Sequence, residues 1–165
     1  MLFGPLCSAR GMVAVSFFSG APADDWVHTP PVTERREDGV VDGTGESYTV
    51  SWEAKDPRIS ATATISMNET DYGAGLTTLA PTGDIGSIRT YLFRIVNDDG
   101  SWEGQFQELV LETPEFSSNS GWLTGTDAYE GLHAYMVWSV TDELTFRGHI
   151  TAEGPPPAPE TLPEG

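Results

Sequence analysis

Between residues 48 and 152 the chain alternates apolar and polar residues, and turns rich in Gly, Asp, Asn and Pro interrupt the alternation. A period of two places successive side chains on opposite faces of a β-strand, whereas an amphipathic helix needs a period of about 3.6 residues. No sustained helical period occurs in this region. The pattern therefore predicts an all-β domain.

The first predicted hairpin joins residues 48–54 to residues 59–67 through the loop Lys55-Asp56-Pro57-Arg58. Closing this loop puts every apolar residue of both strands on one face, and such agreement between loop length and pattern is what sets a strand register. The predicted pairs are Ala54 with Ile59, Trp52 with Ala61, Val50 with Ala63 and Tyr48 with Ile65.

The second predicted hairpin joins residues 88–96 to residues 101–109 through a turn at 97–100, where Gly100 is expected to adopt a positive φ. Pairing Val96 with Ser101 sets four further pairs on one face: Ile95 with Trp102, Phe93 with Gly104, Tyr91 with Phe106 and Arg89 with Glu108. On the other face Arg94 meets Glu103. This exposed ion pair helps to select the register and adds little stability.

The third predicted hairpin joins residues 132–140 to residues 144–152 through Thr141-Asp142-Glu143. Its apolar face pairs Val140 with Leu144, Trp138 with Phe146, Met136 with Gly148 and Ala134 with Ile150. The reverse face brings together His133, Tyr135, Arg147 and His149.

A further strand at about 116–124, with one or two strands between residues 12 and 41, gives seven to nine antiparallel strands. Because each hairpin has one apolar face, the pattern favours a single meander β-barrel of about eight strands, with a β-sandwich as the alternative. We expect residues 1–31 to be loosely attached, residues 32–153 to form the barrel and the Pro- and Glu-rich residues 154–165 to be a disordered tail.

The formal charge of −17 argues against nucleic acids and anionic membrane surfaces as partners, since both are bound chiefly through Lys and Arg. The single Cys7 rules out disulfide frameworks and sites that need several cysteines. No run approaches the roughly 20 apolar residues of a membrane-spanning helix. A cytoplasmic location is favoured, and secretion is the alternative, because Arg10, a short apolar run and Ala21-Pro22-Ala23 resemble a signal peptide.

Residues 125–135, GTDAYEGLHAY, place a Gly-x-x-x-aromatic-x-Gly turn between two strands, and the strand LTFRGHI follows at 144–150. This order resembles the end of the barrel in allene oxide cyclases, and dirigent proteins have a comparable Gly-rich turn. Together with KDPR and NDDGSWEG, it is also similar to uncharacterised bacterial proteins. The resemblance implies a barrel that binds an apolar small molecule and steers a cyclisation without a cofactor. No catalytic residue of the cyclases maps onto this sequence.

The register predicts one aromatic face that can bind a ligand, formed by Trp52, Tyr91, Phe93, Trp102, Phe106 and Trp138. These side chains either line a hollow lumen or fill a closed one. Arg89 and Glu108, paired where their strands end, are the candidate catalytic residues, with the guanidinium stabilising negative charge that develops on the ligand.

Other conspicuous residues have ordinary structural interpretations. Glu130 is expected to be a solvated turn residue, and Tyr129 is expected to pack under the same turn. The face with His133, Tyr135, Arg147 and His149 is expected to be solvated and has no carboxylate to complete a metal site. The residues Asn97, Asp98, Asp99 and Glu103 lack the spacing of a calcium loop, so no metal is predicted.

Two functions follow from the sequence. The first is a barrel that binds a hydrophobic small molecule and acts as a cyclase or isomerase, and the second is a non-catalytic structural or interaction barrel. A homo-oligomer is compatible with both. A serine or cysteine hydrolase is excluded, because the chain has neither a G-x-S-x-G motif nor a suitably placed cysteine.

Overall fold

The computed structural model describes residues 14–72, 84–113, 116–139 and 145–157. Within these ranges the chain forms one antiparallel sheet of ten strands and no helix. The strands are β1 (Ser16–Pro22), β2 (Val27–Thr29), β3 (Val32–Arg35), β4 (Val41–Ala54), β5 (Ala61–Asp71), β6 (Asp84–Val96), β7 (Gly100–Thr113), β8 (Phe116–Asp127), β9 (His133–Ser139) and β10 (Thr145–Thr151). The described residues therefore contain no helix that is long and apolar enough to cross a membrane.

Strand β1 closes the sheet on itself. Its residues 16–20 pair with 146–150 of β10, and its residues 20–22 pair with 52–54 of β4. Since β4 to β10 pair in sequence order, eight strands form a hydrogen-bonded ring. The prediction of an all-β fold is confirmed, and the ring is consistent with either a barrel or a sandwich.

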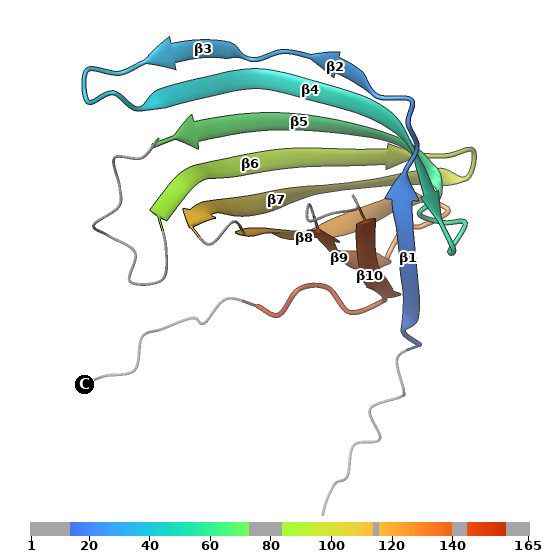
Figure 1. Cartoon of the computed structure of the whole chain (residues 1–165). Coiled ribbons are helices and arrows are strands. Elements are labelled where there is room, and N and C mark those ends of the chain that lie inside the picture. Colours follow the sequence, from blue (N-terminus) through green and yellow to red (C-terminus); the bar gives the residue numbers. More distant parts are fainter. Residues whose placement is uncertain (1–13, 73–83, 114–115, 140–144, 158–165) are drawn as a thin grey trace, which may run out of the picture.

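The ring is closed at one end only. Beyond the three residue pairs that join β1 to β4, the same edge of β4 is occupied by β2 and then by β3. In Figure 1, β4 to β7 continue away from β1 as a long curved sheet. We call the region around Glu46, Glu69, Arg89 and Glu108 on the inner face of these strands the open end.

With one exception, the predicted pairs of the three hairpins that fall within the described residues are confirmed. One pair is wrong: Ala54 pairs with Gly20 of β1, and Ile59 lies in a turn where its N–H donates to the carbonyl of Asp56. The loop is therefore longer than predicted, and within it the Asp56 carboxylate accepts from both the backbone and the side chain of Arg58. The Val140–Leu144 pair and the 141–143 loop lie outside the described residues.

The turn at 97–100 forms as predicted, with the Asn97 side chain accepting from the N–H groups of Asp99 and Gly100. The expectation of a positive φ at Gly100 is wrong, because the glycines with positive φ in the described ranges are Gly39, Gly45 and Gly131. Glycine is needed at position 100 for space: a Cβ there would lie 2.6 Å from the Thr126 carbonyl oxygen.

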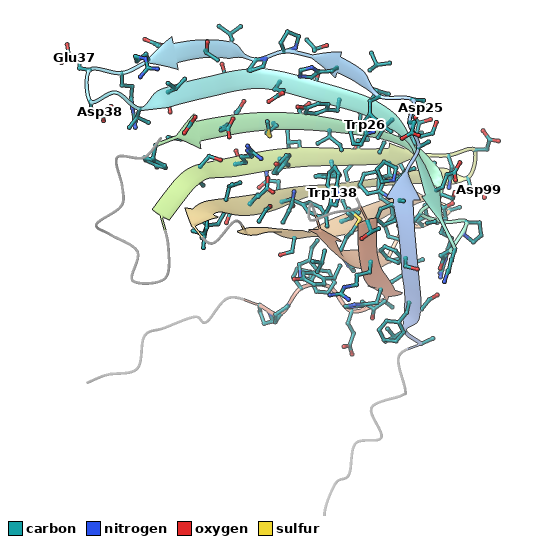
Figure 2. All side chains as sticks on the ribbon, viewed as in Figure 1. Asp25, Trp26, Glu37, Asp38, Asp99 and Trp138 are labelled. Carbon is teal, nitrogen blue, oxygen red and sulfur yellow. The ribbon has the colours of Figure 1, made fainter. Side chains whose placement is uncertain are left out.

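The sheet begins before the boundary that we expected at residue 32. Within the segment 1–31, residues 16–22 form the closing strand β1, and Phe18 is buried in the core. The segment also carries Trp26, whose ring stacks on Trp138 with centroids 6.3 Å apart (Figure 2). Apolar burial therefore ties this part of the segment to the ring.

Glycines face large aromatic residues across the inner surface. Phe93 pairs with Gly104, Phe106 with Gly121 and Trp102 with Gly125. A Cβ on Gly121 would lie 2.6 Å from the Phe106 ring. Alternation of small and large residues is how a small closed sheet fits bulky side chains into its interior.

Candidate functional site

A row of polar residues crosses the inner face at the open end. The strand registers place Glu69 of β5, Arg89 of β6, Glu108 of β7 and Asn119 of β8 side by side, with Trp138 of β9 next to Asn119. Inner positions of a closed sheet are normally apolar, so a charged row there is unusual. It is the candidate site.

Glu108 is the centre of this row. Its carboxylate accepts hydrogen bonds from the hydroxyl groups of Tyr91 and Ser117, and Arg89 Nη1 lies 3.4 Å from its Oε2. The Arg89 Nε donates to Glu69 Oε1 at 2.7 Å. The Glu108 side chain is 2% exposed and that of Arg89 is 32% exposed, so the guanidinium faces the opening and the carboxylate lies beneath it.

The protonation states follow from these contacts. Burial and the hydrogen bond to Glu108 raise the pKa of Tyr91 well above its usual value, so its hydroxyl remains a neutral donor. Burial opposes the charge on Arg89, but the hydrogen bond and negative charge of Glu69 outweigh it and raise the pKa of Arg89. Arg89 therefore stays cationic.

A second polar group lies beside the row. Glu46 of β4 accepts from the Tyr48 hydroxyl and is 2.8 Å from His28 Nε2 of β2. The His28 and Tyr48 rings stack with centroids 4.6 Å apart. Burial, followed by the hydrogen bond to Glu46 and its charge, raises the pKa of Tyr48 to about 12, and the charges of Arg89 and Glu69 also act on this hydroxyl.

We expect the free energy of unfolding to fall as the pH rises from 10 to 12, and Tyr48→Phe to make this fall shallower. The pKa of Tyr48 is near its ordinary value of 10 in the unfolded chain and about 12 in the folded protein, so the folded protein keeps the proton to higher pH. The stabilising contribution is therefore complete below pH 10 and is lost as the pH approaches 12. Urea denaturation followed by circular dichroism measures it, and an equally steep fall in Tyr48→Phe would contradict the assignment.

Four buried polar atoms on the inner face have no hydrogen-bond partner among the residues that the structure describes. They are Trp52 Nε1 in the aromatic core, Ser87 Oγ, Asn119 Oδ1 and Trp138 Nε1. Asn119 and Trp138 belong to the polar row itself, and Ser87 lies on the same face of β6 as Arg89. An unsatisfied buried polar atom costs about 1–3 kcal/mol, and these atoms can accept from or donate to a bound molecule.

The six aromatic residues predicted to bind a ligand are all buried and pack as a core. Trp52 contacts Phe146, Trp138 and Phe93 with ring centroids 4.4, 5.5 and 5.7 Å apart, and Phe93 lies 4.3 Å from Phe106. Trp102 instead stacks on Tyr129 at 5.0 Å under the Gly125–Gly131 turn. Tyr91, Phe106 and Trp138 are therefore the members of the set that adjoin the polar row.

The other conspicuous residues lie away from the polar row. Glu130 is exposed, and the buried Tyr129 donates to Asn97. On the outer face, Tyr135 and His149 lie with ring centroids 5.9 Å apart, flanked in the register by His133 and Arg147. In the described ranges no three His, Cys, Asp or Glu side chains are grouped to hold a metal ion.

The sequence pattern located Arg89 and Glu108 and missed most of their neighbours. Glu69 lies at an inner position of β5 in the alternation that begins at Ala61, so its register was available as a signal. Ser117 and Asn119 required the pairing of β8 with β7. No local signal identified His28 and Glu46, which meet because β2 returns along the edge of β4, or Trp26, which packs on Trp138.

Comparison of the chain with protein-family models, with curated proteins and with solved structures gave no match.

Proposed function

We propose that the protein binds a small, largely apolar molecule at the open end of the ring, with the polar group of that molecule held by Arg89, Glu108 and Asn119. The observation that carries the proposal is a carboxylate buried in an aromatic interior and connected to a partly exposed guanidinium. Burying a charge costs several kcal/mol, and such groups are concentrated at binding and catalytic sites.

The surroundings suit a molecule with an apolar body. Met67, Tyr91, Phe106 and Trp138 are buried next to the polar row and provide an apolar wall. Small-molecule sites commonly combine apolar walls with a few polar groups that fix the orientation of the ligand.

The charges favour a hydroxyl or amino group on the ligand. Glu46, Glu69 and Glu108 supply three carboxylates, whereas Arg89 supplies one guanidinium and is already hydrogen-bonded to two of them. A free carboxylate on the ligand would be repelled by this excess of negative charge. The preferred ligand is therefore neutral or cationic.

A second candidate function is the cyclisation or isomerisation of such a molecule without a cofactor, as the resemblance to allene oxide cyclases implies. Glu108 favours it, because a carboxylate in an apolar interior can accept a proton from a bound ligand. The Arg89 guanidinium can stabilise the oxyanion that results. Tyr91, with its raised pKa, would position Glu108 as a hydrogen-bond donor and would not act as the acid.

Displacement of the neutral fluorescent probe N-phenyl-1-naphthylamine by decylamine, decanol and decanoic acid tests the binding proposal. The amine and the alcohol are expected to displace the probe at lower concentrations than the acid. Arg89→Ala and Glu108→Gln are expected to weaken binding by about tenfold or more, equivalent to about 1.4 kcal/mol.

Arg94→Ala is the matched control, because Arg94 forms a similar ion pair with Glu103 at 3.0 Å on the outer face of the same two strands. Binding of the probe should be unchanged in this variant. Equal affinities in Arg89→Ala and Arg94→Ala, or no binding of the probe to the wild type, would leave the non-catalytic interaction barrel as the better explanation.

A further inference from the structure

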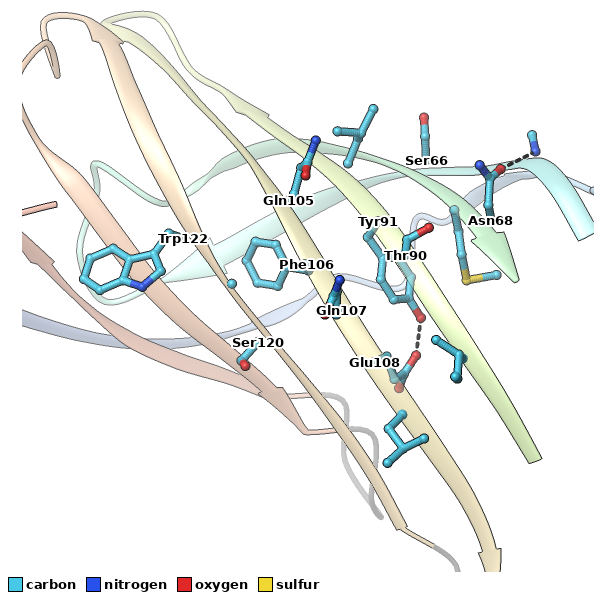
Figure 3. A pocket seen from close by; sticks show the side chains of 16 residues that line it. Ser66, Asn68, Thr90, Tyr91, Gln105, Phe106, Gln107, Glu108, Ser120 and Trp122 are labelled. Atoms are coloured by element: carbon cyan, nitrogen blue, oxygen red, sulfur yellow. Dashed lines mark hydrogen bonds between the residues drawn. The ribbon is translucent and has the colours of Figure 1, made fainter. Parts of the chain in front are cut away.

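A groove of about 1100 Å³ is lined chiefly by residues of β5 to β8 (Figure 3). Its lining alternates along each strand: the side chains of Asn68, Thr90, Gln105, Gln107 and Ser120 point outward, whereas the residues between them that also line it, Met67, Tyr91, Phe106 and Glu108 among them, are buried. The groove therefore lies on the opposite face of the sheet from the polar row around Glu108.

The outward side chains of the groove are uncharged although the protein is strongly acidic. Of 165 residues 25 are Asp or Glu, yet none of the outward side chains that line the groove is ionisable. Amide and hydroxyl groups provide its polar atoms, and Ile88, Leu92, Leu109 and Trp122 provide its apolar surface. Such a lining recognises hydrogen-bonding groups next to apolar patches and offers nothing specific to a charged ligand.

Aromatic rings continue the groove across the neighbouring strands. The register aligns Gln105 of β7 with Trp122, Tyr135, His149 and Phe17 of β8, β9, β10 and β1. Trp122 lies 5.3 Å from Tyr135 and 5.8 Å from His149 between ring centroids, and Phe17 is 80% exposed. Partly exposed rings and the exposed Phe17 therefore form one outward row next to amide side chains.

We propose that this groove and its aromatic row bind a neutral oligosaccharide. Pyranose rings present C–H faces that pack on aromatic rings and hydroxyl groups that bond to amide and hydroxyl side chains. Neighbouring strands are about 4.8 Å apart, close to the length of one hexose unit in an extended chain, so the row presents a new side chain to each unit. The site is separate from the proposed site at Glu108.

A second copy of the chain is the competing occupant, because Leu92 and Phe17 are exposed apolar residues. Two copies that each carry a formal charge of −17 repel one another. A dimer interface on this face would also need a hydrogen-bond partner for every amide group that it buries. Both considerations favour a neutral solute whose hydroxyl groups can satisfy the amides.

Affinity gel electrophoresis with hydroxyethyl cellulose, laminarin, galactomannan and the anionic polygalacturonate tests the proposal. At least one neutral glycan is expected to slow the wild-type protein, and polygalacturonate is not. Binding should be unchanged by added salt, because a neutral glycan carries no charge whose attraction could be screened. Trp122→Ala and Gln107→Ala are each expected to weaken binding about tenfold.

Thr64→Ala is the control, since Thr64 is an exposed outward residue of β5 that does not line the groove. Gln107→Ala removes an exposed side chain, so this variant tests the groove even if Trp122→Ala is unstable. Three results would overturn the proposal: no binding of any neutral glycan, binding that persists in a Gln107→Ala, Trp122→Ala double variant, or a wild-type dimer that Leu92→Glu dissociates. Loss of glycan binding in Glu108→Gln would place the glycan at the inner site instead.

Discussion

Replacing Trp52 with alanine is expected to lower the free energy of unfolding by about 3–5 kcal/mol, as expected for truncation of a large buried aromatic residue. Trp52 is 1% exposed and contacts Phe93, Trp138 and Phe146. Its removal would leave a cavity among rings that cannot all move together, because the strand ladders hold their backbones. Urea denaturation followed by far-ultraviolet circular dichroism measures the change.

Trp122→Ala is the matched control for this prediction. Trp122 lies on the outer face and contacts Tyr135 and His149. Its truncation is expected to cost about 1 kcal/mol, typical of a partly exposed residue. If Trp52→Ala cost no more than Trp122→Ala, the aromatic residues would line a hollow lumen, which was the alternative that the sequence left open.

The inner registers were predictable because one pattern constrains many pairs at once. Shifting either strand of the Arg89–Glu108 hairpin by one residue would put Phe93 and Phe106 on opposite faces, so the apolar alternation admits one solution. The turn at Asn97 agrees with it. The pairing of Arg89 with Glu108 was therefore predictable from apolar residues that take no part in the proposed chemistry.

The pattern favoured a closed sheet, but the strand that closes the ring was not predictable from it. Strand β1 pairs with β4 through three residues and joins strands far apart in the sequence, and β2 and β3 are short and exposed. Short strands carry too few residues for an alternation to be recognised. The contact between His28 and Glu46 depends on the pairing of the short strand β2 with β4, so the alternation did not predict it.

The two faces of β7 illustrate how one strand separates two kinds of chemistry. Phe106 and Glu108 point inward to the aromatic core and the polar row, whereas Gln105 and Gln107 point outward into the groove. Because adjacent residues alternate, a substitution at one position leaves the opposite face intact. The two proposed sites can therefore be tested independently on a single strand.

Glu108→Ala is expected to lower the free energy of unfolding by about 3 kcal/mol, since removing one partner of a buried ion pair leaves the remaining buried groups without their partner. The hydroxyl groups of Tyr91 and Ser117 would lose their acceptor, and Arg89 would keep only Glu69. Glu103→Ala, which breaks the exposed pair with Arg94, is expected to cost about 0–1 kcal/mol, and added salt should reduce that cost.

A double variant separates the role of this cluster in the fold from its role in binding. With Arg89→Leu and Glu108→Gln together, no charge remains buried at position 108, and the glutamine oxygen can still accept from Tyr91 and Ser117. Stability is expected to return to within about 1 kcal/mol of the wild type, because neutral replacements of buried ion pairs are often tolerated. Displacement of the naphthylamine probe by decylamine should nevertheless be lost. A stable double variant that still binds decylamine would show that the buried charges serve neither the fold nor the ligand.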